Sequence, residues 1–135
     1  MKIAVLMTCY DRVQTTLRCL ERLKRACAKV DDAKFDVWLV DDASPDCTGE
    51  KVKAAFPEVN VVRSNGNLFW CKGMRLAWDE AVKFAADKPY DFYLWLNDDV
   101  MLKDIALVNL FSDYKKHGGV IAGKFSTDES ESDIS

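Results

Sequence analysis

Acidic and hydroxyl side chains gather at three points of the chain, and each group directly follows a run of apolar residues. The groups are Thr8 to Arg12, Asp41 to Asp46 and Asn97 to Asp99. If each apolar run is a strand of one parallel sheet, the carboxyl ends of these strands lie along a common edge, where open α/β sheets bind their ligands. We therefore expect residues far apart in the sequence to face one ligand there.

The adjacent acids Asp98 and Asp99 are the pair best suited to a cation. Two carboxylates about 4 Å apart repel each other by about 4 kcal/mol at an effective dielectric constant of about 20, so a positive charge should accompany them. Oxygen ligands suit magnesium or manganese, and no cysteine or histidine is near enough in the sequence to indicate a softer ion. Neighbouring side chains of an extended segment point to opposite sides. We therefore assign Asp99 to the metal and Asp98 to a ribose hydroxyl.

A second acidic pair, Asp41 and Asp42, ends the second apolar run. Asp42 is the better candidate to accept a hydrogen bond from a nucleobase N–H, because it lies one step further out of the sheet. Thr8 and Tyr10 are placed to bracket that base, with Tyr10 offering a ring face. Each acidic pair also has a structural interpretation. Asp41 and Asp42 could simply form a turn, and Asp98 and Asp99 could simply end a strand and begin the next helix.

Strands and helices that would position these groups alternate along the chain. Short apolar runs predict strands at Lys2 to Met7, Phe35 to Val40, Asn60 to Arg63, Phe92 to Leu96 and Val120 to Ala122. Apolar residues at three- and four-residue steps predict four inward helix faces: Leu17, Leu20, Leu23, Cys27 and Val30; Val52, Ala55 and Phe56, after Thr48 as the cap; Trp70, Met74, Ala77, Ala81 and Phe84; and Ile105, Val108 and Phe111. This order predicts an α/β fold, Rossmann-like, with three layers (α/β/α) and a mainly parallel sheet.

The length of 135 residues predicts one domain, because domains usually hold about 100–200 residues. We expect this domain to comprise residues 1–125. Residues 126–135 are mostly serine and acidic residues, with Ile134 as the one apolar side chain. Such a segment buries too little surface to offset the entropy of ordering it, so a mobile tail is predicted.

Composition excludes several classes of function. The formal net charge is −3 and the basic residues are interspersed with acidic ones, so no nucleic-acid partner is expected. No apolar stretch approaches the roughly 18 residues of a membrane span, which predicts a cytoplasmic chain, either free or peripheral to a membrane. The five cysteines form no Cys-x-x-Cys pair, so we expect reduced thiols and neither a zinc site nor a disulfide framework.

Four segments together resemble the family 2 glycosyltransferases of the GT-A fold. These segments are Ile3 to Arg12, Val40 to Asp46, Asn65 to Met74 and Leu94 to Val100. They occur in the order found in that family and extend over most of the chain, up to about Lys124. The resemblance implies a nucleotide-sugar-binding domain with a divalent metal, Mg or Mn. It further implies inverting transfer of a glycosyl group from a nucleoside diphosphate sugar to a hydroxyl group. The acceptor would be a glycan or a lipid-linked molecule, as in cell-surface polysaccharide biosynthesis.

The resemblance also implies roles for single residues. Thr8, Cys9, Tyr10 and Arg12 are similar to the nucleotide-facing loop, and Asp42 is similar to the base-binding acid. Asn97, Asp98 and Asp99 are similar to the metal motif of the family, with Asp99 as the ligand. Lys72 and Arg75 are the candidate anion contacts near the diphosphate, with solvated helix charges as the alternative. The general base and the acceptor-binding elements of the family are expected further along than Ser135.

Two other classes of protein share parts of this pattern. A nucleotidyltransferase would normally carry a glycine-rich phosphate loop after its first strand, and residues 8–12 contain no glycine. A non-catalytic nucleotide-binding module of the same fold stays open as an alternative, because one fold hosts many functions.

Overall fold

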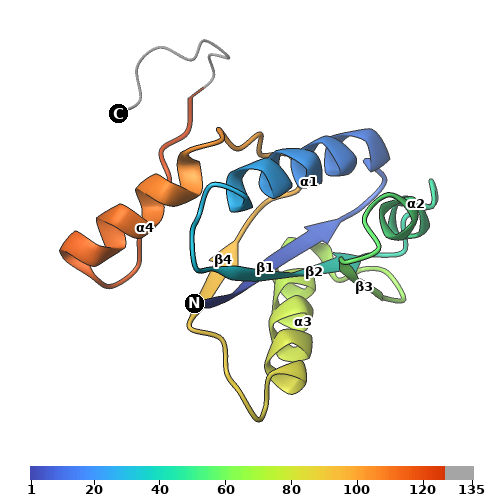
Figure 1. Cartoon of the computed structure of the whole chain (residues 1–135). Helices are drawn as coiled ribbons and strands as arrows, with labels where there is room; N and C mark the ends of the chain where they lie inside the picture. The colour runs from blue at the N-terminus through green and yellow to red at the C-terminus, as the bar shows by residue number, and fades with distance from the viewer. Residues whose placement is uncertain (127–135) are drawn as a thin grey trace.

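The structure is a computed structural model and describes residues 1–126. Strands and helices alternate through this part of the chain (Figure 1). The strands are β1 (Lys2–Cys9), β2 (Lys34–Asp41), β3 (Asn60–Arg63) and β4 (Phe92–Trp95). The helices are α1 (Val13–Cys27), α2 (Thr48–Ala55), α3 (Phe69–Phe84) and α4 (Ala106–His117).

The four strands form one parallel sheet in the order β3-β2-β1-β4. The register pairs Leu6 of β1 with Trp38 of β2 and with Trp95 of β4, and it places Cys9 beside Asp41 at the carboxyl ends. The ends of β1, β2 and β4 therefore lie along one edge of the sheet, as the polar clusters in the sequence predict.

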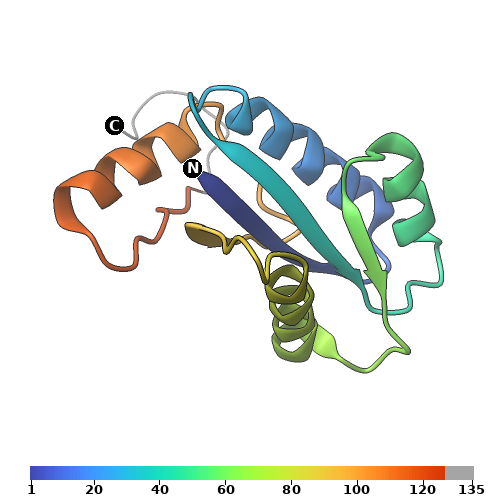
Figure 2. The same ribbon diagram turned by 60° about the horizontal axis from the view of Figure 1, so that its bottom comes forward.

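Helices cover both faces of the sheet. One face packs against α1 and α2 and receives Leu107 from α4, whereas the other face packs against α3. Figure 2 shows the same arrangement, with α3 on its own below the sheet. The predicted three-layer, Rossmann-like α/β fold is thus confirmed.

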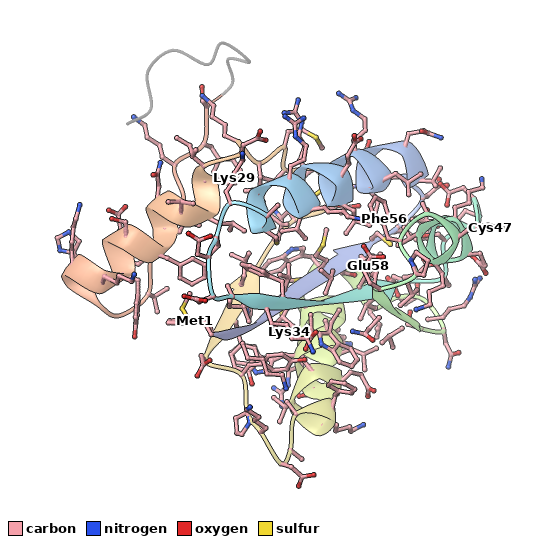
Figure 3. The ribbon with its side chains drawn as sticks, in the orientation of Figure 1. Met1, Lys29, Lys34, Cys47, Phe56 and Glu58 are labelled. Carbon is pink, nitrogen blue, oxygen red and sulfur yellow. The ribbon has the colours of Figure 1, made fainter. Side chains whose placement is uncertain are left out.

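Strand β1 is the centre of the core. Its residues Ile3 to Met7 are all fully buried, because successive side chains point to opposite faces and each face is covered by helices. Val5 and Met7 enter the core beneath α1, while Ala4 and Leu6 enter the core above α3. Figure 3 shows the side chains that fill the space on both sides of the sheet.

The predicted fifth strand, Val120 to Ala122, is wrong: the structure assigns these residues no strand. Val120 is 99% exposed. The chain arrives there through Gly118 and Gly119, both with positive φ, which turn the backbone after α4. Three apolar residues then find no partner within the described sheet, because they do not reach the open edge of β4.

Two details of α2 differ from the prediction. Thr48 is the first residue of the helix and not its cap; its backbone N–H and hydroxyl both donate to Asp46 Oδ1. Val52 is buried as predicted, but Ala55 is exposed. The helix spans only residues 48–55 and packs through a narrow contact, so one apolar position is enough to anchor it.

The predicted inner faces of α3 and α4 are correct only in part. Met74, Ala77 and Ala81 are buried in α3, whereas Trp70 and Phe84 at its ends are exposed. Each of these two rings still packs edge-on against a tryptophan of a strand, Trp70 against Trp95 and Phe84 against Trp38. In α4 the buried residue is Leu107, and the predicted Ile105 and Val108 are exposed. Phe111 packs against Phe35 and Phe92.

The predicted tail falls outside the described residues except for Ser126. No helix of the described part combines the length and the apolar character that a membrane span needs. The cytoplasmic location stays a prediction.

Candidate functional site at the carboxyl edge of the sheet

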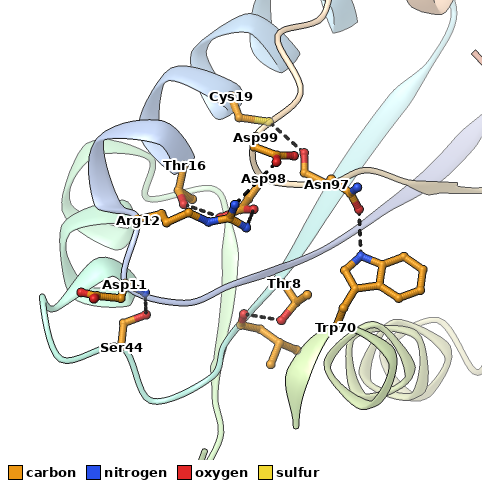
Figure 4. Close-up of polar contacts among 11 residues, drawn as sticks. Thr8, Asp11, Arg12, Thr16, Cys19, Ser44, Trp70, Asn97, Asp98 and Asp99 are labelled. Atoms are coloured by element: carbon orange, nitrogen blue, oxygen red, sulfur yellow. Dashed lines mark hydrogen bonds and ion pairs between the residues drawn. The ribbon is translucent and has the colours of Figure 1, made fainter. Parts of the chain in front are cut away.

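Arg12 joins the loop after β1 to the loop after β4. Its guanidinium Nη2 donates to Asp98 Oδ1 at 2.5 Å, and Nη1 lies 3.5 Å from Asp99 Oδ2. Two of the three clusters found in the sequence therefore meet in space across 86 residues. The positive charge expected beside the acid pair is supplied by the chain itself (Figure 4).

Asp98 points into the protein. The residue is 1% exposed, and its second oxygen accepts a hydrogen bond from the buried Thr16 hydroxyl at 3.0 Å. Burial raises the pKa of Asp98 above its ordinary value, against the opposing effects of the Thr16 hydrogen bond and of the Arg12 charge. An accessible oxygen is required for the predicted ribose contact, and Asp98 does not present one. Its place in the structure is that of a support for Arg12.

Asp99 is the acid of the pair that faces solvent, with 53% of its side chain exposed. Asn97, two residues earlier, holds the loop in place from both sides: its carbonyl accepts a hydrogen bond from the Cys19 thiol of α1, and its side-chain oxygen accepts one from Trp70 Nε1 at 2.8 Å. Asn97 and its neighbours are therefore fixed while the Asp99 carboxylate stays accessible (Figure 4).

Asp42 lies on the other side of β1, where it binds the segment that leads into α3. Its carboxylate accepts hydrogen bonds from the Ser64 hydroxyl at 2.7 Å and from the backbone N–H groups of Leu68 and Phe69 at 3.0–3.1 Å. Burial opposes ionisation of Asp42, but these three donors outweigh it and hold its pKa below the ordinary value. The Leu68 N–H is shared between both oxygens, so each oxygen of Asp42 accepts two hydrogen bonds from the protein.

Asp41 is fully buried and serves the fold. Its two oxygens accept the backbone N–H groups of Ser44 and Gly49. These contacts support the interpretation of Asp41 as a residue that stabilises the turn after β2.

The remaining predicted residues after β1 differ in accessibility. Cys9 is buried, whereas the Tyr10 ring is 56% exposed. The Thr8 hydroxyl donates to the Val40 carbonyl, and Thr8 also lies directly against Gly73 of α3, where an added Cβ would be 2.5 Å from its oxygen. Thr8 therefore fixes the approach of α3 to the sheet, and Tyr10 is the ring that a ligand can reach.

The two candidate anion contacts of α3 are not part of the cluster around Arg12. Arg75 forms an ion pair with Asp79 one turn along the helix, at 3.0 Å. Lys72 is exposed. Their role as anion contacts stays a prediction.

Backbone strain is concentrated in the loops along this edge. Among the described residues other than glycine, positive φ occurs in the loops after β1, β2 and β3 at five positions, Asp11, Ala43, Cys47, Asn67 and Phe69, and elsewhere at Asp32. Phe69, at +54°, is the most unusual, because a bulky side chain is rarely found there. Strain of this kind tends to persist at functional sites, where the surroundings impose it; here Asp42 fixes the Phe69 N–H.

Sequence reasoning missed Thr16, Ser64 and the role of Trp70 at this edge. Thr16 carried a usable signal, since it lies one helical turn after Arg12 and interrupts an apolar face. Ser64 and Trp70 carried none, because their partners are 22 and 27 residues away.

Asp99 is the carboxylate at this edge that could contribute to a metal site. Within residues 1–126, no three or more histidine, cysteine, aspartate or glutamate side chains gather to hold a metal. One accessible carboxylate, Asp99, suits Mg²⁺ or a similar hard ion, which commonly keeps several waters and takes further oxygens from the phosphates of a substrate.

A shallow concavity of about 240 Å³ lies on the outer side of α2 and β3. Its lining residues are Asp41, Gly49, Glu50, Lys53, Val61 and Arg63. None of the predicted site residues is among them, so this concavity is separate from the edge that carries Asp99.

Comparison with solved structures shows the same fold in TarS of S. aureus. A crystal structure of TarS 1-349 superposes with a TM-score of 0.66 at 21% identity, covering 87% of this chain and 33% of that one. The complex of TarS 1-349 with UDP-GlcNAc gives 0.66 at 22% identity, and the complex with UDP gives 0.62 at 23% identity. The chain thus spans about a third of the length of these solved chains. No curated protein sequence matches it.

The sequence model described as glycosyl transferase family 2 matches residues 4–133. This match extends over nearly the whole chain, and it covers the four segments on which the resemblance in the sequence was based, apart from Ile3. The protein belongs to glycosyl transferase family 2.

Proposed function

We propose that the chain binds the donor substrate of a glycosyltransferase, a nucleoside diphosphate sugar together with Mg²⁺ or Mn²⁺. The observation that carries the proposal is the arrangement at the end of β4: Asp99 faces solvent while Asp98 and Arg12 are held behind it. Family membership supports it, and so does the similarity in fold to TarS, which was solved with UDP-GlcNAc and with UDP.

The proposed positions of the ligand follow the order of the strands. The base lies over β1 and β2, beside the exposed ring of Tyr10 and the carboxylate of Asp42. The diphosphate lies towards β4, where Asp99 would bind the cation and Arg12 is the nearest described guanidinium. Adjacent strands are about 4.8 Å apart, so the two ends of the site are separated by a distance that a nucleoside diphosphate can bridge.

The chemistry would be inverting transfer of the glycosyl group to a hydroxyl of a glycan or lipid-linked acceptor. A divalent ion, when bound, neutralises charge on the departing diphosphate. Arg12 adds a fixed positive charge beside it, and Asp98 with Thr16 keeps the guanidinium from turning away. We assign the general base to no residue of residues 1–126, and we propose that this chain alone binds the donor without turning it over.

The test is calorimetric titration with UDP, GDP and dTDP, with and without MnCl₂. We expect metal-dependent binding of one nucleotide, and an affinity at least about tenfold lower in Asp99→Asn, because loss of one charged ligand removes more than about 1.4 kcal/mol. Asp113→Asn, which replaces an exposed acid of α4, is the matched control and should bind as the wild type does. Binding that ignores Mn²⁺ and Asp99 would favour the non-catalytic module.

A further inference from the structure

Two indole rings lie half exposed beside the loop that carries Asp98 and Asp99, and the proposed function gives neither ring a role. Trp70, in the first turn of α3, is 48% exposed, and Trp95, the last residue of β4, is 46% exposed. Their ring centroids are 5.8 Å apart and the planes meet at 62°. Tryptophan buries more apolar area than most side chains when it is covered, so two adjacent half-covered rings form a surface suited to a ligand.

Both rings are held in place from within the protein. Trp70 donates its indole N–H to Asn97 Oδ1 at 2.8 Å, so its orientation is set by the same loop that carries Asp99 (Figure 4). Trp95 packs edge-on against Trp78, with centroids 5.4 Å apart, and Trp78 stacks on Tyr93. The exposed corner formed by Trp70 and Trp95 is therefore rigid, and little side-chain entropy is lost when a ligand binds there.

The position of this corner limits what it can bind. It lies at the β4 end of the edge, whereas Tyr10 and Asp42, which we propose to hold the base, follow β1 and β2. A group attached to the diphosphate on the side away from the nucleoside would come next to Trp70 and Trp95. In a nucleoside diphosphate sugar, that group is the sugar.

The chemistry of the corner suits a pyranose. The ring C–H groups of a pyranose present an apolar face that packs on an aromatic ring, while its hydroxyls need polar partners around the rim. Asn97 and Asp99 provide an amide and a carboxylate beside the indoles, and ligand sites of small molecules combine aromatic walls with a few such polar groups. We propose that Trp70 and Trp95 form the stacking surface for the donor sugar, an inference that rests on the proposed donor-binding function.

The experiment compares each nucleotide with its own sugar conjugate. The affinities of UDP and UDP-glucose, GDP and GDP-mannose, and dTDP and dTDP-glucose are measured by calorimetry with MnCl₂ for the wild type, Trp70→Leu and Trp95→Leu. We expect Trp95→Leu to bind the sugar nucleotide about tenfold more weakly, the loss of one aromatic contact, and to bind the free diphosphate within about twofold of the wild type. Trp70→Leu also loses the hydrogen bond to Asn97 that fixes the loop of Asp99, so the effect of its ring is taken from the comparison with Trp70→Phe, which loses the same bond.

Two controls keep the result interpretable. Phe84→Leu replaces an exposed aromatic residue at the opposite end of α3 and should leave both affinities unchanged. Trp70→Phe keeps a ring but loses the hydrogen bond to Asn97, and it should bind the sugar nucleotide with an affinity between those of the wild type and Trp70→Leu. Thermal unfolding of each variant verifies that it is folded.

The possible failures are distinct. Equal weakening of the sugar nucleotide and the free diphosphate in Trp95→Leu would place the base or the phosphates, not the sugar, at the corner and overturn the inference. Unchanged affinities in both tryptophan variants would also overturn it while the donor-binding function stands. A wild type that binds no nucleotide with Mn²⁺ would refute the proposed function and, with it, this inference.

Discussion

At the scale of single residues, the acids that look alike in the sequence have separate tasks. Asp99 faces solvent, Asp98 holds Arg12, and Asp42 holds the segment before α3. The difference comes from the donors around each carboxylate. A buried carboxylate requires partners for its oxygens, and where the fold supplies them the acid becomes part of the structure.

Replacement of Asp42 by asparagine should destabilise the protein in a pH-dependent manner. Asp42→Asn loses charge-assisted bonds to Ser64, Leu68 and Phe69, and we expect its free energy of unfolding near pH 7 to be about 1–3 kcal/mol lower. The pKa of Asp42 is lowered in the folded protein, so its ionised form stabilises the wild type above the ordinary carboxyl pKa. This stabilisation is lost as the pH falls through that value and then through the lowered one.

Urea unfolding of Asp42→Asn and the wild type at pH 7 and at about pH 3 measures this effect. The difference in free energy of unfolding between the two proteins should be smaller at the lower pH. Asp113→Asn serves as the control and should unfold with the free energy of the wild type at either pH. A difference of equal size at both pH values for Asp42→Asn would mean that the ionised carboxylate does not matter.

At the scale of elements, one acidic loop organises the amino ends of three helices. Asp41 accepts the N–H of Gly49 in α2, Asp42 accepts that of Phe69 in α3, and Asp46 accepts that of Val13 in α1. None of these helices has a side-chain cap from its own N-cap residue. Free N–H groups and the helix dipole both favour a negative charge there, so the loop after β2 joins the sheet to its helices.

A glycine sets the distance between α3 and the sheet. An added Cβ at Gly73 would lie 2.5 Å from Thr8 Oγ1 and 3.0 Å from Thr8 Cβ. Overpacking costs about 1–3 kcal/mol, and the higher helix propensity of alanine returns about 1 kcal/mol. We therefore expect Gly73→Ala to lower the free energy of unfolding by about 1 kcal/mol, as measured in urea.

A double-mutant cycle with Thr8→Ala isolates the contact. The combined variant should be more stable than the sum of the two single effects implies, because Thr8→Ala removes the nearest atom. Lys72→Ala, the exposed neighbour on α3, is the control. If Gly73→Ala stabilised the protein as it does in an open helix, the close approach of α3 would be refuted.

At the scale of the whole molecule, burial divides the cysteines into inner thiols and exposed ones. Cys9 and Cys19 are buried, Cys27 is partly buried, and Cys47 and Cys71 are exposed; Cys47 lies at the periphery beside α2 (Figure 3). Burial raises the pKa of Cys27 to about 12, and burial together with the nearby charge of Asp98 raises that of Cys19 to about 12. Thiolates are the reactive form, so the inner thiols should be inert.

Labelling with a chromogenic disulfide reagent at pH 8 should therefore show two fast thiols in the native protein and all five in denaturant. Cys47→Ala and Cys71→Ala should each remove one fast equivalent. A third thiol that reacts at the fast rate would show that the core opens around α1 in the native state.

The sequence alone determined the class of the fold and the place of the chemistry. The apolar runs at Lys2 to Met7 and Phe35 to Val40 predict buried strands, because burial on both faces needs continuous apolar residues. The polar clusters after them predict the functional edge, because parallel strands end on one side. These signals are local, and the four segments from Ile3 to Val100 were enough to indicate the family that the match over residues 4–133 shows.

Only the tertiary structure decided which groups face the ligand. Asp98 and Asp99 are neighbours of the same chemistry. Asp98 turns inward because Arg12 and Thr16, more than 80 residues earlier in the chain, donate hydrogen bonds to its two oxygens. Trp70 has the periodicity of a core residue but lies half exposed in the first turn of α3, beside Trp95 at the end of β4. Val120 has the composition of a strand but finds no partner. In each case the outcome depends on contacts between distant segments, which local composition and periodicity do not encode.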